Sequence, residues 1–222
     1  RLVQRSLTSI LGFRDRSPLT LAVAGEFVYF TANDLVHGVE LWKTDGTVAG
    51  TELVQDIVPG PEGFHLQYLA SVGGKLFFSG YDRTNIPKLR MSDGVTPGAI
   101  VVKEFVPGGD DVRLEGAVDY AGRLFFEYDD GVSGEELWVT DGTGAGTMLV
   151  KDIAPGSGNS RPSSLRSIGG KLLFAAISSY GHQLWTSDGT VGGTTLVKEI
   201  NVGTEDSYPQ KMTGVGDSLF FF

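Results

Sequence analysis

Cysteine is absent from the 222 residues, and no apolar run approaches the length of a membrane span. The missing thiols exclude structural disulfides and thiolate metal sites. A spanning helix needs about 20 apolar residues, so we expect no membrane insertion. Cationic residues are few: 18 lysines and arginines against 27 aspartates and glutamates give a net charge of −9 and a pI near 4.8. Nucleic acid and anionic membranes need a basic surface, so we expect neither as a partner.

A helical pattern is also lacking, since no segment repeats apolar residues at the 3.6-residue period. What is abundant is glycine, with 32 residues beside 9 prolines. With 41 % hydrophobic residues the chain is rich in turns yet not disordered. It begins at Arg1 without a methionine or a signal-like segment. We therefore expect a mature or excised piece whose export signal would have lain upstream.

One unit of 18 residues recurs four times along the chain. It reads ELWKTDGTVAGTELVQDI, KLRMSDGVTPGAIVVKEF, ELWVTDGTGAGTMLVKDI and QLWTSDGTVGGTTLVKEI in Glu40–Ile57, Lys88–Phe105, Glu136–Ile153 and Gln183–Ile200. Its Asp-Gly turns begin at Asp45, Asp93, Asp141 and Asp188, so the steps are 48, 48 and 47 residues. A fixed period of this size indicates a repeat architecture.

The unit resembles the bacterial repeat family named for its ELWxxDGT motif. Three copies match the motif closely, and Lys88–Phe105 departs from it at several positions. The resemblance covers nearly the whole chain. It implies a large secreted or cell-surface bacterial protein with propeller-like all-β repeats, and it implies no defined activity.

Each repeat is predicted to hold four short strands. The first resembles Leu66–Val72, the third Glu40–Thr44 and the fourth Leu53–Ile57; the second is Lys75–Ser79, with relatives at Phe27–Thr31, Arg123–Glu127, Lys171–Ala175 and Ser218–Phe222. Leu41 and Trp42 are adjacent and so point to opposite sides of their strand. Sheets covered on both faces are typical of radially stacked blades, so we predict an all-β fold, a β-propeller of four-stranded blades. A linear β-solenoid is the main alternative.

We predict a single domain over residues 1–222. Its repeats run approximately over 18–65, 66–113, 114–161 and 162–208, and a fifth blade is shared by 1–17 and 209–222. Pro209–Phe222 would supply strands one and two of that blade, and Leu2–Leu7 strand four. Its third strand is missing, which leaves Ser9–Arg14 or another chain as candidates, so self-association through the incomplete blade is one hypothesis. The alternative is that the chain belongs to a longer array.

The recurring polar and aromatic residues have two interpretations each. Asp45, Asp141 and Asp188 are general acids or metal ligands on one hypothesis and turn fasteners on the other, which their recurrence in each blade favours. The three tryptophans are sugar-stacking platforms or core residues, and mid-strand positions favour the core. In the second repeat Arg90 takes the tryptophan place, while Val95 and Ala99 replace turn threonines. Drift or a specialised site explains this change.

The candidate site is the set of loops after strands two and four of each repeat, which we call the variable loop face. Strand order places them at one end of each blade, and their sequences differ between repeats. The predicted ligand- or partner-binding residues are Asn33, Asp34, His37, His65, Tyr81, Asp82, Arg83, Arg113, Asp129, Asp130, Arg161, Tyr180, His182 and Tyr208. A solvated rim is the alternative. Asn33-Asp34 and Asp129-Asp130 would also suit Ca²⁺, whereas the histidine spacing shows no zinc pattern.

Three functions follow from these patterns. The first is a secreted or cell-surface, non-enzymatic module that binds a protein or glycan through the variable loop face. The second is a lectin with several equivalent sites between blades. The third is an enzyme, which would need two carboxylates and a histidine with raised pKa values gathered at the mouth of a central channel.

Overall fold

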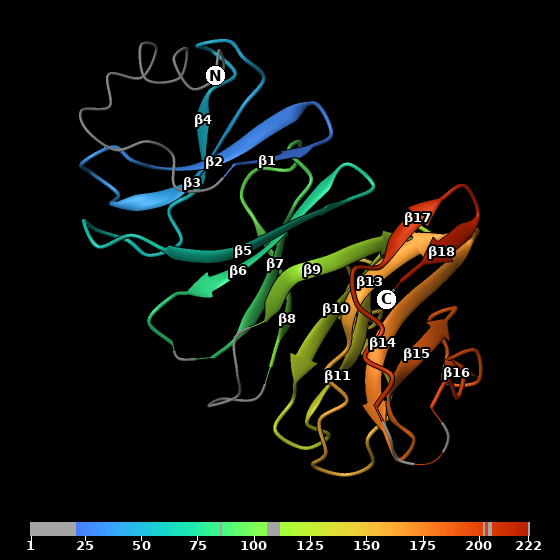
Figure 1. Cartoon of the computed structure of the whole chain (residues 1–222). Coiled ribbons are helices and arrows are strands. Elements are labelled where there is room, and N and C mark those ends of the chain that lie inside the picture. Colours follow the sequence, from blue (N-terminus) through green and yellow to red (C-terminus); the bar gives the residue numbers. More distant parts are fainter. Residues whose placement is uncertain (1–20, 85, 106–111, 202, 204–205, 222) are drawn as a thin grey trace. The chain divides into compact units, whose positions relative to one another are not determined.

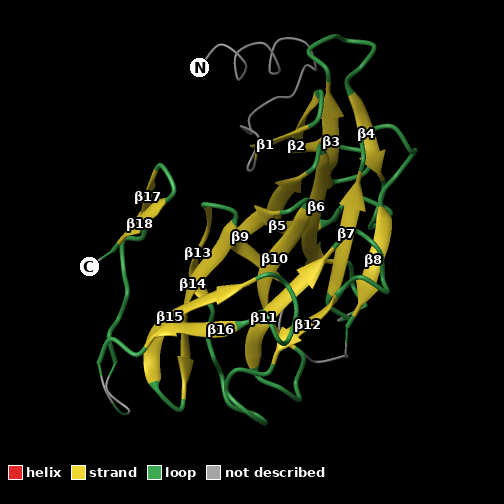
Figure 2. Cartoon of the chain, turned by 90° about the vertical axis from the view of Figure 1, so that its right-hand side faces the viewer, coloured by secondary structure: helices red, strands yellow, loops and turns green. Residues whose placement is uncertain are grey.

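The recurring strands form four antiparallel sheets of four strands each. The computed structural model describes residues 21–84, 86–105, 112–201, 203 and 206–221. The chain divides into two compact units, residues 1–104 and 105–222. Within the described residues all regular structure is strand, joined by loops (Figure 2). No helix there is long and apolar enough to cross a membrane. That the whole chain is one domain stays a prediction.

The first unit contains the sheets of repeats one and two, each a simple meander in which neighbours in sequence pair (Figure 1). The strands of repeat one are β1 (Leu21–Ala24), β2 (Phe27–Asn33), β3 (Val39–Thr44) and β4 (Glu52–Gln55). Those of repeat two are β5 (His65–Val72), β6 (Lys75–Tyr81), β7 (Lys88–Ser92) and β8 (Ile100–Glu104). Observed and predicted strands agree to within about two residues at most ends.

The second unit contains repeats three and four and a C-terminal hairpin. Repeat three has β9 (Arg113–Tyr120), β10 (Arg123–Asp129), β11 (Glu135–Thr140) and β12 (Met148–Lys151). Repeat four has β13 (Ser163–Ile168), β14 (Lys171–Ser178), β15 (Gly181–Ser187) and β16 (Thr195–Lys198), and the hairpin is β17 (Thr213–Val215) with β18 (Ser218–Phe220).

The inner strands of the four-stranded sheets are buried on both faces, as the paired apolar residues predicted. On β6, the neighbours Phe77 and Phe78 point to opposite faces and are 2 % and 0 % exposed. One apolar cluster joins Tyr29 and Leu41 of repeat one to Phe78 of repeat two. Another joins Phe125 of repeat three to Phe174 of repeat four. Burial of these large side chains between sheets supplies the main stabilising force.

The predicted fifth blade is only partly within the described residues. Its first two strands form the expected hairpin β17–β18, where Leu219 and Phe221 pack against Leu184 and Met212. Leu2–Leu7 and Ser9–Arg14 lie outside the described residues, as does the range 1–17 as a whole. Four four-stranded sheets and one hairpin are compatible with five blades. The shared blade and the self-association through it stay predictions.

The DGT turns are fastened as the sequence predicted. Asp188 Oδ1 accepts hydrogen bonds from the backbone N–H and the hydroxyl of Thr190, at 2.9 and 2.7 Å. The same pair of bonds recurs at Asp45 and Asp141. A second fastening joins the hydroxyls of Ser187 and Thr194 at 2.7 Å, and it recurs between Thr44 and Thr51 and between Thr140 and Thr147.

The turn of repeat two, where Val95 and Ala99 replace the turn threonines, has a different fastening. Asp93 Oδ1 accepts the N–H groups of Val95 and Thr96, and the Thr96 hydroxyl donates to Asp93 Oδ2 at 2.7 Å. Thr96, one residue later than in the other repeats, therefore substitutes for the missing partner. The hydroxyl of Ser92 is 3.4 Å from that of Tyr29, because Ala99 offers no hydroxyl.

Replacing Thr194 by valine should lower the free energy of unfolding by about 1–3 kcal/mol, because it removes the hydroxyl that bonds the Ser187 hydroxyl and donates to the Thr190 carbonyl. Thr194 is fully buried, so water does not replace the lost bonds. Denaturant titration measures the loss. Thr195→Val, at the exposed neighbouring position, is the matched control and should change stability little. Equal losses in both variants would contradict the fastening role.

Candidate functional site

In repeats one, three and four, the loops after strands two and four lie at the same end of the sheet. A backbone N–H group of the loop after strand four donates to the first residue of strand three, or to its neighbour. These bonds join Phe64 N to Val39 O at 2.7 Å, Ser160 N to Glu135 O at 2.9 Å and Ser207 N to His182 O at 2.9 Å. In these three repeats, the predicted variable loop face therefore gathers the loops that the sequence assigned to it.

A buried acidic or amide side chain secures each of these loops, and sequence reasoning missed it. Glu40, Glu136 and Gln183 occupy the same repeat position and are all fully buried. Glu40 Oε1 accepts the Val58 N–H at 3.0 Å, and Glu136 Oε1 the Ala154 N–H at 2.9 Å. Gln183 Oε1 accepts the Ile200 N–H at 3.2 Å. Their recurrence beside apolar strand residues is the signal that would have found them.

A serine hydroxyl completes this arrangement in repeats three and four but not in repeat one. Ser160 donates to Glu136 Oε2 at 2.6 Å, and Ser207 donates to Gln183 Oε1 at 2.8 Å. Phe64 takes the serine position in repeat one, and Glu40 Oε2 is buried with no hydrogen-bond partner among the described residues. Burial raises the pKa of Glu40 from 4.5 to about 7, against the bonds from Val58.

Several predicted site residues turn out to organise their own loops. Asn33 Oδ1 accepts the Leu35 N–H, and Asp34 Oδ1 accepts the N–H groups of Val36 and His37. Asp34 Oδ2 also contacts His37 Nδ1 at 2.6 Å. Burial acts to raise the pKa of Asp34, but the hydrogen bonds from His37 outweigh burial and hold this pKa below its usual value. The Asp34 carboxylate raises the pKa of His37 in turn.

Asp129 and Asp130 repeat this arrangement in the third repeat. Asp129 Oδ1 accepts the Gly131 N–H, and Asp130 Oδ1 accepts the N–H groups of Val132 and Ser133. These oxygens would be the first ligands of the suggested Ca²⁺, and they are already engaged by the backbone. Throughout the described ranges, no three His, Cys, Asp or Glu side chains converge as a metal-binding group. The carboxylates act as loop fasteners here.

In the second unit, a charged cluster brings together two of the predicted arginines. Arg161 Nε donates to Glu135 Oε2 at 3.1 Å, and Arg113 Nη1 donates to Glu135 Oε1 at 3.4 Å. Arg113 Nη1 also lies 3.9 Å from Glu127 Oε1. Burial and then the charge of Glu135 raise the pKa of Glu127. Glu135 is 17 % exposed and orients two arginine side chains that are 47 % and 64 % exposed.

An aromatic cluster forms in repeat four. The rings of His182 and Tyr208 meet edge to face, with centroids 5.4 Å apart. Asp206 Oδ1 accepts the His182 N–H at 2.6 Å, and the hydrogen bond between Tyr208 and Asp206 raises the pKa of Tyr208. Burial lowers the pKa of His182, whereas Asp206 opposes the shift. Tyr180, 47 % exposed, follows β14 in the adjoining loop.

In the first unit, the predicted residues separate into three environments. Arg83 is exposed and donates to Glu62 Oε2 at 2.6 Å. His65 pairs with Tyr81 across β5 and β6. Asp82 is buried instead, with its side chain 8 % exposed, and forms ion pairs with Lys88 and Arg90. Glu62, Lys88, Arg90, Glu127, Glu135 and Asp206 thus join the site, although the sequence analysis did not include them.

Two of the three tryptophans are core residues in the structure, and Trp42 is partly buried. Trp138 and Trp185 are 7 % and 6 % exposed. Trp185 belongs to the cluster of repeats three and four, and Trp138 meets Phe105 and Tyr128 edge to face, at 5.7 and 5.5 Å between ring centroids. Sugar stacking on the ring faces of these two side chains is not supported.

No protein-family model and no curated protein matches this chain. Solved structures do match. Dipeptidyl peptidase 4 of Porphyromonas gingivalis gives a TM-score of 0.61 at 13 % identity, over 95 % of this chain and 33 % of that one. A puromycin hydrolase S511A mutant complexed with PGG gives a TM-score of 0.52 at 16 % identity, over 90 % and 32 %.

These solved structures contain β-propellers, and at such identities the likeness shows the fold alone. The chain spans about a third of the length of these two proteins. Together with the four-stranded antiparallel sheets and the absence of helix in the described ranges, the likeness confirms the predicted fold class. The chain is an all-β protein, a β-propeller of four-stranded blades.

Proposed function

We propose that this propeller is a non-enzymatic binding module of a secreted or cell-surface bacterial protein related to the ELWxxDGT repeats. One observation carries the proposal: the variable loop face combines a fixed backbone with exposed side chains that differ in each repeat. The same fastening of loop to strand recurs at Val39, Glu135 and His182. A ligand that meets such loops needs to order little backbone, which favours affinity.

The charged cluster of repeat three is the strongest contact candidate. Glu135 holds Arg113 and Arg161 in place while leaving much of both guanidinium groups exposed. Arginine held in this way is well suited to a carboxylate or to an aromatic ring of a protein or glycan partner. A lectin with equivalent sites is the second candidate. It is less well supported, because the matching positions His65, Arg113, Arg161 and Tyr208 differ in chemistry.

An enzymatic role would use the acid–base capacity of Glu127, whose pKa is raised. Its neighbour Glu135 is engaged by the two arginines, so it already has a structural task. The binding role requires no such proton transfer. We therefore prefer the binding role over the enzymatic role. Hydrolysis of a bound glycan or peptide by the protein would favour the enzymatic role.

The double variant Arg113→Ala/Arg161→Ala should weaken binding to the partner by about 30-fold, the size expected when roughly 2 kcal/mol of contact energy is removed. Partners are sought on a glycan array and among immobilised cell-surface proteins, and affinities of the hits are then measured by surface plasmon resonance. Val191→Ser, an exposed change in the DGT turn of repeat four, is the control and should leave binding unchanged. Equal affinity of both variants would refute the proposed face.

A further inference from the structure

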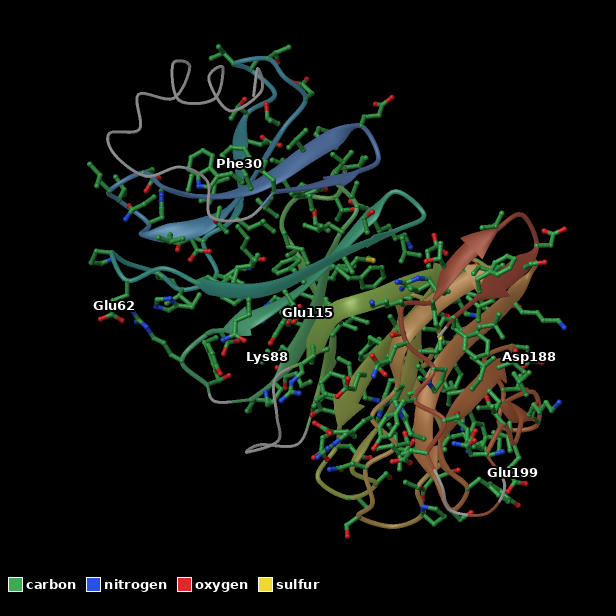
Figure 3. All side chains as sticks on the ribbon, in the orientation of Figure 1. Phe30, Glu62, Lys88, Glu115, Asp188 and Glu199 are labelled. Carbon is green, nitrogen blue, oxygen red and sulfur yellow. The ribbon has the colours of Figure 1, made fainter. Side chains whose placement is uncertain are left out.

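The second blade differs from the others at the two positions that the motif fills most regularly. Arg90 stands where the other repeats have tryptophan, and Lys88 where they have Glu40, Glu136 or Gln183. Both are buried, at 5 % and 8 % exposure (Lys88 is labelled in Figure 3). An ammonium group only donates hydrogen bonds. Lys88 therefore cannot accept the loop N–H groups as its counterparts do.

The strands of this blade also separate at their loop end. Pairing of β6 with β7 stops at Phe78 and Arg90. In the first and third blades the matching ladders continue to the last strand residues, Asn33 with Val39 and Asp129 with Glu135. Beyond Phe78, β6 keeps its pairing with β5 as far as His65 and Tyr81. The β6–β7 ladder is therefore open at its loop end, where the side chains of Asp82, Lys88 and Arg90 lie.

The buried charges at this end of the blade do not balance, because the cations Lys88 and Arg90 share the buried anion Asp82. Asp82 Oδ2 accepts hydrogen bonds from Lys88 Nζ, at 2.7 Å, and from Arg90 Nη2. Although burial opposes it, Lys88 and Thr84 hold the pKa of Asp82 well below its usual range, so it is a full anion. Two buried cations thus share one buried carboxylate. The remaining neighbour, Glu104, is 57 % exposed and reaches only Lys88, at 3.6 Å.

Arg90 is the group that this arrangement leaves incomplete. Its Cζ lies 5.2 Å from the centre of the Phe64 ring, and one terminal nitrogen binds Asp82. The other terminal nitrogen, Nη1, is buried and has no hydrogen-bond partner within the described part of the chain. A buried charged donor without a partner is costly. Such a donor therefore calls for an acceptor that carries negative charge.

We propose that the open end of the β6–β7 ladder is a binding subsite for a single carboxylate group, which Arg90 Nη1 receives. One negative charge matches the excess of one cation over Asp82. A dianionic phosphate would leave the subsite with an unbalanced negative charge. The inference rests on the proposed binding role of the variable loop face and names the ligand chemistry at one blade. The carboxylate belongs to an acidic side chain of a peptide or to an acidic sugar.

The test titrates the protein with glutarate, with glucuronate and with inorganic phosphate at constant ionic strength. Backbone amide shifts of Thr84 and Ile86, beside the subsite, report binding by NMR without any substitution. We expect saturable shifts with the carboxylates. Tighter binding of glutarate identifies a peptide ligand, and tighter binding of glucuronate an acidic sugar. No saturable shift, or saturation by phosphate alone, would overturn the proposal.

Two variants assign the contact to Arg90. Arg90→Leu should weaken carboxylate binding at least tenfold. Arg90→Lys retains a charge and the ion pair to Asp82, so it serves as the second test variant if Arg90→Leu fails to fold. Val95→Ser, an exposed change in the DGT turn of the same repeat, should bind as the unchanged protein does. Tight binding by both Arg90 variants refutes the subsite. If the subsite is refuted but Arg113→Ala/Arg161→Ala still weakens binding to the partner, the proposed binding function stands without the subsite.

Discussion

Raising the pH from 4.5 to about 7 should lower the free energy of unfolding of the first unit. Glu40→Gln should abolish the part of this loss that comes from ionisation of Glu40. The folded-state pKa of Glu40 is raised to about 7, above 4.5 for the unfolded chain. The folded state therefore binds the proton more tightly, and the stabilisation is complete below pH 4.5 and is lost as the pH approaches 7. A shift of this size corresponds to about 3 kcal/mol.

Denaturant titrations at several pH values measure the effect as the difference between the unchanged protein and the variant. Glutamine is a sound replacement, because Gln183 performs the same role in repeat four. Glu136→Gln is the control. Burial raises the pKa of Glu136 as well, but Ser160 donates to its second oxygen. We therefore expect Glu136→Gln to change the slope of the free energy of unfolding against pH less than Glu40→Gln does. Asp56 and His37, the charged groups near Glu40, are unchanged in both variants. Equal slopes for Glu40→Gln and the unchanged protein would contradict the assignment.

Trp185→Ala should lower the free energy of unfolding by about 3–5 kcal/mol, because it removes a large buried ring from the cluster of repeats three and four. Lys151, whose Nζ lies 5.9 Å from the ring centre, would also lose its contact. Denaturant titration measures the loss. Tyr180→Ala, at an exposed loop aromatic of the same repeat, is the control and should change stability little. A stable Trp185→Ala protein that has lost only glycan binding would restore the sugar-stacking hypothesis.

The period, the strands and the DGT fastenings were predictable from sequence because each depends on contacts within one repeat. Asp45 and Thr47 are two residues apart, and their bond recurs in every close copy. The loop carboxylates were harder to interpret. Asn33 and Asp130 have the residue types of ligands, yet their oxygens bind neighbouring N–H groups. Composition alone does not separate these two uses of a short polar side chain.

What the sequence did not reveal depends on contacts across strands. Arg90 is a departure from the motif when considered alone, and its meaning comes from Asp82, eight residues away on the other side of the open ladder. Glu135 was passed over because its two arginine partners lie 22 and 26 residues away. The buried role of Glu40 was likewise hidden, because a charged residue at a strand position is ordinarily exposed.

The central claim is that ligands bind the variable loop face while the DGT turns only hold the blades together. Affinity for the identified partner, compared between Arg113→Ala/Arg161→Ala/His182→Ala and Val48→Ser/Val191→Ser, tests it most directly, after circular dichroism has shown both proteins folded. We predict that the loop variant loses the partner and that the turn variant, whose two valines are 71 % and 63 % exposed, binds normally. Loss of binding in the turn variant with normal binding in the loop variant would contradict the account.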